Sequence, residues 1–212
     1  MEELELLKKD WQENQKFPKL SKQEIYALLH KKSSSIVKWI FILSLIEFGF
    51  WTLLALFMKD TEAQQRFDSY EMDHIMIPLM VISYLILGYF FVTFYKNYKK
   101  ISSTDSVKLL MKNILNTRKT VKHYVLFNLV FIYISLILGV WIEMDKSPDF
   151  QLITSKFTET NEYLIMYGIV ALLTLLMMVV LTGILLGFYY LVYGILLKRL
   201  KKNYKALEEI ER

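Results

Sequence analysis

The sequence contains no cysteine, and this absence excludes three kinds of chemistry. Without thiols the chain forms no disulfide, holds no metal through thiolate ligands and offers no cysteine nucleophile. Histidine is scarce too, with three in 212 residues. No HExxH motif, paired catalytic carboxylates or glycine-rich phosphate loop occurs. We therefore expect neither an enzyme nor a bound cofactor or metal ion.

The N-terminus lacks the basic segment and short apolar run of a secretory signal. Its first residues, MEELELLKKDWQENQ, are acidic and polar, and the first long apolar stretch begins only near Ser35. That stretch is long enough to span a membrane. We expect it to be retained as an anchor and not cleaved.

Apolar residues are abundant, and the charged residues are gathered in blocks between them. Hydrophobic residues make up 54% of the chain and aromatic residues 15%. A membrane-spanning helix needs about 20 mostly apolar residues. Four segments satisfy this requirement, at residues 36–58, 75–95, 124–142 and 163–197. We predict an all-α fold, an integral membrane four-helix bundle with external loops at 59–74 and 143–162.

The distribution of positive charge predicts the orientation of these spans. The chain has 26 lysine and arginine residues, and 22 of them lie in three places. These are the segment up to the first turn of the first span, the loop between the second and third spans, and the segment after the fourth span. The external loops hold four basic residues beside ten acidic ones. Cytoplasmic loops carry an excess of lysine and arginine. We therefore expect a bacterial inner-membrane protein with both termini in the cytoplasm, where its basic residues contact anionic inner-leaflet lipids and not nucleic acid.

Three segments on the basic side are expected to be amphipathic cytoplasmic helices, at residues 1–35, 96–123 and 198–212. The first contains a capping box at Ser21 and Glu24, and Ser33 to Ser35 would loosen its join to the first span. The last continues the fourth helix into the cytoplasm, because residues 163–211 as one helix would be roughly 70 Å long. The simplest interpretation is that the three segments pack on one another.

A sharper alternative gives the N-terminal arm a protein partner. Leu4, Leu7 and Trp11 recur at helical spacing and would share one face. Phe17 and Pro18 separate this stripe from the following helix. An amphipathic helix can place its apolar face in the groove of a soluble protein. On this interpretation the arm binds a cytosolic protein.

Glu47 is the one acidic residue deep inside an apolar segment. Counted from Ile36 at about 1.5 Å per residue, it lies about 16 Å into the first span, near mid-depth. A carboxylate there costs at least a few kcal/mol, so we expect it to face the bundle and to be neutral or paired. Several polar side chains lie near that depth by the same count and could hydrogen-bond it. They are Ser83, Tyr84, Tyr133, Ser135, Thr174 and, nearer the cytoplasm, Asn128.

Two interpretations of this intramembrane polar site stay open. One is structural, because polar side chains hold membrane helices together through hydrogen bonds. The other is a proton or cation site, because ionisable residues inside membranes mark ion pathways. Transporters commonly carry several such residues or helices broken at mid-span, and neither occurs here.

The fourth span carries small residues at helical spacing. Gly183 and Gly187 form a GxxxG motif, and Gly194 follows seven residues later. Small residues let two helix backbones approach closely. We expect this face to pack within the chain, with a homodimer as the alternative.

The N-terminal residues resemble those of a known group of proteins. The segment LELLKKDWQEN, followed by KLSKQEIYALLHKKSSSIVKWI, is similar to the start of four-span inner-membrane proteins from Bacteroidota-type bacteria, which begin with an L-K-x-x-W-Q arm. The matching residues are Leu7, Lys8, Trp11 and Gln12. Some of these proteins are encoded near extracytoplasmic-function sigma factors. The resemblance therefore implies membrane-linked regulation and a sigma-factor-type regulator as partner.

Relatives of that group also carry a carotene-monooxygenase label. The intramembrane carotene-cleaving family depends on several clustered histidines. The predicted topology separates His30 and His123 from His74, so this chain cannot supply such a cluster. Our leading prediction is a non-enzymatic regulatory or scaffolding protein acting through its cytoplasmic helices. The alternative is a small proton- or cation-coupled transporter or channel that uses Glu47.

Overall fold

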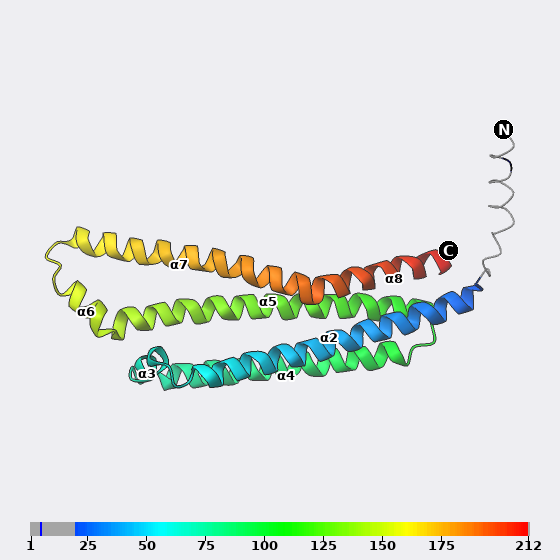
Figure 1. Cartoon of the computed structure of the whole chain (residues 1–212), viewed down its shortest axis with the longest axis horizontal. Coiled ribbons are helices and arrows are strands. Elements are labelled where there is room, and N and C mark those ends of the chain that lie inside the picture. Colours follow the sequence, from blue (N-terminus) through cyan, green and yellow to red (C-terminus); the bar gives the residue numbers. More distant parts are fainter. Residues whose placement is uncertain (1–4, 6–19, 212) are drawn as a thin grey trace.

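The structure is a computed structural model that describes residue 5 and residues 20–211. Four long helical rods run side by side in alternating directions (Figure 1). They are α2 (Lys22–Met58), α4 (Asp73–Ser102), α5 (Val107–Lys146), and α7 (Thr160–Tyr189), which continues through the π-helical turn η1 (Tyr190–Gly194) into α8 (Ile195–Glu211). Short helices join the rods, with α3 (Glu62–Asp68) between α2 and α4 and α6 (Pro148–Thr154) between α5 and α7.

These four rods are long and apolar enough to cross a membrane. No strand occurs among the described residues, so the predicted all-α class is confirmed. The arm residues Leu4, Leu7 and Trp11 lie outside the described part of the chain.

The two ends of the bundle differ in charge. Helices α3 and α6 lie together at one end, which we call the acidic end because residues 59–74 and 143–162 hold ten acids beside four basic residues (Figure 1). The α4–α5 connection and the C-terminus lie at the other end, which we call the basic end. The chain therefore keeps the charge segregation that its sequence predicts.

Side-chain caps mark where two of the rods begin. The Ser21 hydroxyl accepts a hydrogen bond from the Glu24 amide at 3.2 Å, and the Glu24 carboxylate accepts one from the Ser21 amide at 2.7 Å. This confirms the predicted capping box. A similar box starts α7, where the Glu162 carboxylate accepts a bond from the Glu159 amide at 3.2 Å.

The basic-side segments are continuous with the spans and are not separate helices. Helix α2 passes through Ser33 to Ser35 without interruption, so the expected loosening there is wrong. The reason is packing, because Ser33 is fully buried and its hydroxyl accepts a bond from the Asn203 amide group at 3.1 Å. Helix α5 likewise runs unbroken from Val107 through the third span.

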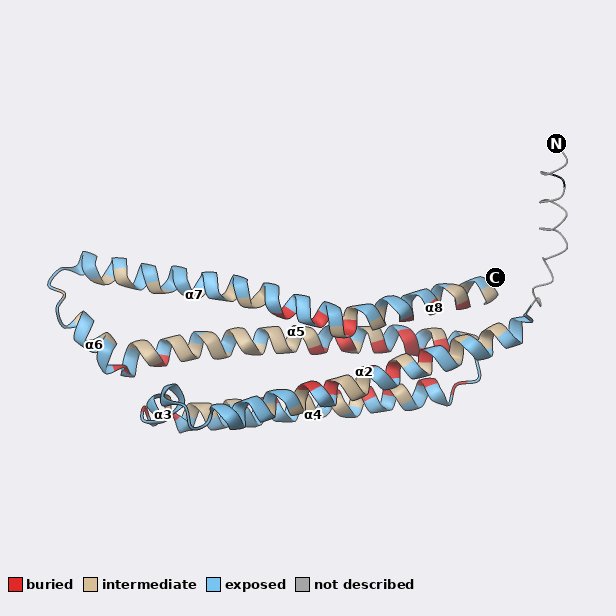
Figure 2. Cartoon of the chain, viewed as in Figure 1, coloured by how far each residue is buried: buried red, intermediate tan, exposed pale blue. Residues whose placement is uncertain are grey.

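The core lies toward the basic end, where most buried residues gather (Figure 2). One buried cluster there joins α2, α4, α5 and α8, and its members are Val37, Ile101, Leu110, Ile114, Leu200 and Leu207. Hydrogen bonds reinforce it, including Tyr26 hydroxyl to Thr104 carbonyl at 2.9 Å and Asn97 to Thr120 at 3.1 Å. In the described part of the chain, residues 20–35, 96–123 and 198–211 thus pack on one another, as the simplest interpretation predicts.

The acidic end is packed more loosely. Helix α7 stands away from α5 over much of its length (Figure 1), and its buried residues are Leu185 and Tyr189, both near its end. The buried cluster at this end is small and consists of Tyr70, Met72 and Ile142. An exposed ion pair between Arg66 and Asp149, at 3.4 Å, joins α3 to α6, and such pairs add little stability.

Candidate functional site: a buried carboxylate at the end of a cavity

Glu47 is 6% exposed and accepts hydrogen bonds from three tyrosine hydroxyls. Tyr193 donates to Oε2 at 2.7 Å, Tyr124 donates to the same oxygen at 3.0 Å, and Tyr189 donates to Oε1 at 2.9 Å. A carboxylate accepts hydrogen bonds on both oxygens. These three donors therefore satisfy much of the hydrogen-bonding capacity of the buried group.

The donors come from two helical rods. Tyr189 ends α7 and Tyr193 lies in η1, four residues later, so both face α2. Tyr124 comes from α5 and packs edge-on against Tyr193, with ring centroids 5.9 Å apart. Phe90 and Phe94 of α4 each pack edge-on against Tyr124 at 5.5 Å. Aromatic contacts from a further rod thus hold the hydroxyls in place.

Gly194 explains how the π-helical turn fits beside this cluster. A Cβ atom at Gly194 would lie 2.9 Å from Cδ2 of Tyr190, closer than side chains approach one another. Glycine therefore leaves room for the Tyr190 ring inside the turn. Single π-helical turns within α-helices frequently occur at functional sites.

Glu47 has hydroxyl donors but no basic partner. No ion pair in the described part of the chain includes it, and its hydrogen-bond partners there are the three tyrosines. Removing a charge from water is costly unless another charge compensates it. A carboxyl group in this setting can hold a proton or a mobile cation.

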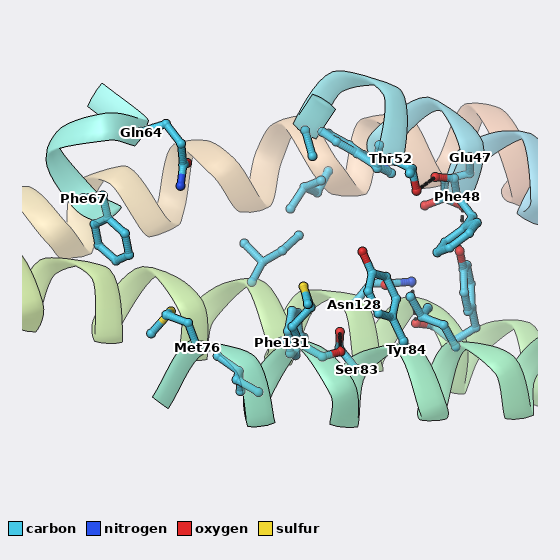
Figure 3. A pocket seen from close by; sticks show the side chains of 18 of the residues that line it. Glu47, Phe48, Thr52, Gln64, Phe67, Met76, Ser83, Tyr84, Asn128 and Phe131 are labelled. Carbon is cyan, nitrogen blue, oxygen red and sulfur yellow. Dashed lines mark hydrogen bonds between the residues drawn. The ribbon is translucent and has the colours of Figure 1, made fainter. Parts of the chain in front are cut away.

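A cavity of about 580 Å³ extends from Glu47 toward the acidic end, between α2, α4, α5 and α7 (Figure 3). Glu47, Tyr124 and Tyr189 line its inner end, and Gln64 and Asp68 of α3 line the other. Along α4 its lining runs from Asp73 to Leu87, which is roughly 20 Å at about 1.5 Å per residue. The cavity therefore connects the acidic end with the buried carboxylate.

The lining of this cavity has one sign of charge. It comprises 22 described residues, of which three are acidic and none is lysine, arginine or histidine. The acids are Glu47, Asp68 and Asp73. Seven are aromatic, namely Phe48, Trp51, Phe67, Tyr84, Tyr124, Phe131 and Tyr189. This composition suits a cationic or amphiphilic occupant and opposes an anionic one.

The cavity brings together some of the polar residues predicted near Glu47. Tyr84, Ser83 and Asn128 all line it. Tyr84 packs edge-on against Phe48 at 5.9 Å, and the Asn128 amide group donates to the Tyr124 carbonyl at 3.1 Å. None of these three donates to Glu47, so their link to it is the shared cavity.

Other predicted neighbours lie elsewhere. Tyr133 hydrogen-bonds Thr182, joining α5 to α7. Thr174 bonds the carbonyl of Val170 in its own helix at 2.7 Å. Neither these residues nor Ser135 lines the cavity.

Glu47 lies closer to the basic end than the residue count predicts. Its donor Tyr124 lies two residues from Lys122, about 3 Å along α5 at about 1.5 Å per residue. Its donor Tyr193 lies five residues from Lys198, about 8 Å along the same rod. The mid-depth prediction assumed that every span begins at one plane. The rods instead extend past the apolar segments and pack at levels set by their shared core.

The three donors were missed because tyrosines near span ends resemble interface anchors. One signal could have found Tyr189 and Tyr193. They are four residues apart on one helix face, and a buried carboxylate requires nearby donors. Tyr124 directly follows the basic pair Lys122-His123, and nothing in its sequence context distinguishes it.

The predicted packing glycines behave differently from one another. A Cβ atom at Gly183 or Gly187 would meet no heavy atom of another described residue within 4 Å. Both glycines are exposed. The preferred expectation of packing within the chain is therefore wrong for these two, and a homodimer stays a prediction. Gly194 contacts Tyr190 of its own rod.

Comparison with known proteins identifies the family of this chain. Its residues 23–212 match the family described as domain of unknown function DUF8845, and the chain belongs to that family. Neither the curated proteins nor the solved structures contain a match. The described residues hold no group of three or more histidine or acidic side chains placed to bind a metal ion.

Proposed function

We propose that this DUF8845 family member is a small proton- or cation-coupled membrane transporter in which Glu47 carries the proton or the cation. One observation carries the proposal. A buried carboxylate with three hydroxyl donors and no basic partner ends a cavity whose charged lining residues are all acidic. Intramembrane ionisable residues of this kind mark ion and substrate pathways.

Coupling would follow from competition for one group. A protonated Glu47 is neutral and needs no partner cation, whereas an ionised Glu47 needs one. When a monovalent cation binds, the carboxylic acid loses its proton and the carboxylate pairs with the cation, so the total charge of the site is conserved. A site that holds either species but not both exchanges one for the other.

Transport also requires that the site reach the opposite side. In the described conformation the cavity extends toward the acidic end, and members of a buried hydrophobic cluster, among them Phe94, Val121 and Tyr193, lie on the basic side of Glu47. Helix α7 packs loosely, and η1 interrupts its α-helical hydrogen bonding. We propose that α7 moves about this turn and exposes Glu47 to the basic side.

Reconstituted liposomes test this function. The purified chain would be placed in vesicles with an acidic lumen and a trapped pH dye, and sodium, potassium or a quaternary ammonium ion would be added outside. We expect cation addition to alkalinise the lumen with the native chain and to have no effect with Glu47→Gln. Glu62→Gln removes an exposed acid outside the cavity and should retain the native rate. If native and Glu47→Gln vesicles respond alike for all three cations, the proposal is wrong.

The proposed orientation has both termini in the cytoplasm of a bacterial inner membrane, as the charge distribution predicts. The absence of cysteine makes the test direct, because a single introduced cysteine is the one reactive thiol. A membrane-impermeant maleimide should label Glu62→Cys in intact cells and Lys108→Cys only after permeabilisation. The reverse result would invert the topology and expose the cavity to the cytoplasm.

A regulatory or scaffolding role is the second candidate, and the apolar stripe at Leu4, Leu7 and Trp11 favours it. The packed basic end would serve as the platform from which this arm binds a cytosolic protein, with a sigma-factor-type regulator as the partner that the resemblance implies. A photo-crosslinker at position 11 should then capture that regulator in cells. Capture of the protein's own helices alone would argue against this role.

A further inference from the structure

We infer that the cavity at Glu47 binds an organic monocation, with an ammonium group near the Glu47 carboxylate and an apolar body in the cavity. The inference rests on the proposed function, because it assigns the substrate class of the same site. Charge gives the first reason. Three acids and no basic residue line the cavity, so its field attracts cations along the whole path.

The aromatic lining gives the second reason. Phe48 lines the cavity beside Glu47, and Tyr84 and Phe131 line it farther along (Figure 3), as does Trp51. Aromatic rings attract ammonium groups through their electron-rich faces, and tryptophan does so most strongly. An organic ammonium ion binds favourably to such a wall, whereas an anion is repelled by it.

Size and ligand type favour an organic ion over a hard divalent metal ion as the main occupant. The cavity measures about 580 Å³, within the usual range of small-molecule sites. Calcium and similar hard cations require about six or more oxygen ligands, whereas much of this cavity is lined by apolar residues such as Met76, Leu79 and Leu87. These side chains suit the hydrocarbon part of an amphiphilic cation.

A pair of ligands that differ only in charge tests the inference. Phenyltrimethylammonium and tert-butylbenzene have nearly the same shape, since a quaternary nitrogen in one replaces a quaternary carbon in the other. Binding of each would be measured by equilibrium titration of the full chain in detergent. We expect the ammonium ion to bind at least tenfold more tightly than the neutral compound, and Glu47→Gln to remove that preference.

A second variant keeps the test informative if Glu47→Gln unfolds. Trp51→Leu replaces a half-exposed tryptophan that lines the cavity, and we expect it to weaken ammonium binding several-fold. Trp141→Leu removes an equally exposed tryptophan outside the cavity and should bind as the native chain does. Equal affinity of the native chain for both ligands would overturn the inference and leave an apolar or lipid-chain site.

The liposome assay separates this inference from the proposed function. If sodium or potassium exchanges for protons through Glu47 but phenyltrimethylammonium does not bind, the substrate class is wrong and the transport proposal stands. If phenyltrimethylammonium binds through Glu47 but no cation moves protons, the binding site stands and transport is wrong.

Discussion

At the basic end the four rods pack closely, whereas toward the acidic end they leave a cavity, although both regions are rich in apolar residues. The difference has a physical origin. Where the rods extend beyond their apolar segments, water drives side chains such as Leu110 and Leu200 together. Inside a bilayer, lipid chains are as apolar as leucine, so no comparable force closes the gap between helices. Specific hydrogen bonds, such as those to Glu47, must then set the spacing.

Removing a side chain from the basic-end core should have the largest effect on stability. Leu200 is fully buried among residues of four rods. Leu200→Ala should lower the free energy of unfolding by about 2–4 kcal/mol, because it removes apolar contacts and leaves a cavity. Chemical denaturation of the purified protein in detergent would measure the change.

The matched variant in the other region is Leu176→Ala. Leu176 lies on α7 and is 58% exposed. We expect a change within about 0.5 kcal/mol, as for surface positions generally. A loss equal to that of Leu200→Ala would mean that another chain covers α7, and the contrast between the two ends would then disappear.

The Glu47 cluster lies between the two regions, and its hydrogen bonds should contribute less than the core. Tyr193→Phe removes the shortest of the three bonds and leaves the ring in place. We expect a loss of about 1–2 kcal/mol, because the remaining acceptor is buried. Tyr190→Phe, in the same turn and 63% exposed, is the control and should be close to neutral. The same denaturation series measures both variants. Equal losses of stability would mean that the Tyr193 hydroxyl does not stabilise the Glu47 site.

The charge pattern and apolar runs predicted the class, the four spans and the packing of the basic-side segments, because each follows from composition and local periodicity. The capping box at Ser21 and Glu24 was equally local. Glu47 stood out because a carboxylate in an apolar run has few physical explanations. These features depend on residues close together in the chain.

The donors to Glu47 could not be predicted in the same way. Tyr124 and Tyr193 are 77 and 146 residues away from Glu47, and their approach depends on how far each rod slides along its neighbours. Counting residues from the start of each apolar segment placed Tyr133 and Ser135 at the depth of Glu47, because that count assumes that the apolar segments begin at the same level. Packing along the full rods, including the parts outside the apolar segments, sets the actual level.

The glycines of the fourth rod offer a smaller effect that also tests for a homodimer. A Cβ atom at Gly187 would meet no described residue outside its own stretch of helix within 4 Å, so Gly187→Ala should raise the free energy of unfolding by up to about 1 kcal/mol through helix propensity. Denaturation and analytical ultracentrifugation in detergent would follow stability and mass together. If Gly187 instead lies at a dimer interface, the substitution should lower stability and shift the protein toward monomer.

Gly194→Ala should have the opposite sign to Gly187→Ala in a monomer. Its added Cβ would lie 2.9 Å from the Tyr190 ring, which must move aside. Tyr190 is exposed and can rotate, so we expect a loss of only about 1 kcal/mol by denaturation. A stabilised Gly194→Ala variant would show that the π-helical turn does not depend on glycine.

The smallest effect concerns the start of α2 at the basic end. Hydrogen bonds from the Ser21 backbone and side chain hold the pKa of Glu24 below its ordinary value of 4.5. A lowered folded-state pKa means that the cap stabilises the helix above the unfolded pKa and loses this contribution as the pH falls through the folded value. An NMR titration of labelled glutamate should give Glu24 a midpoint below 4.5, and Ser21→Ala should return it toward that value because the side-chain partner is lost. A midpoint unchanged by Ser21→Ala would assign the shift to the backbone amide alone. Since Glu24 is exposed and the cap belongs to the first turn, Ser21→Ala should lower the denaturant concentration at the midpoint of unfolding at neutral pH far less than Leu200→Ala does.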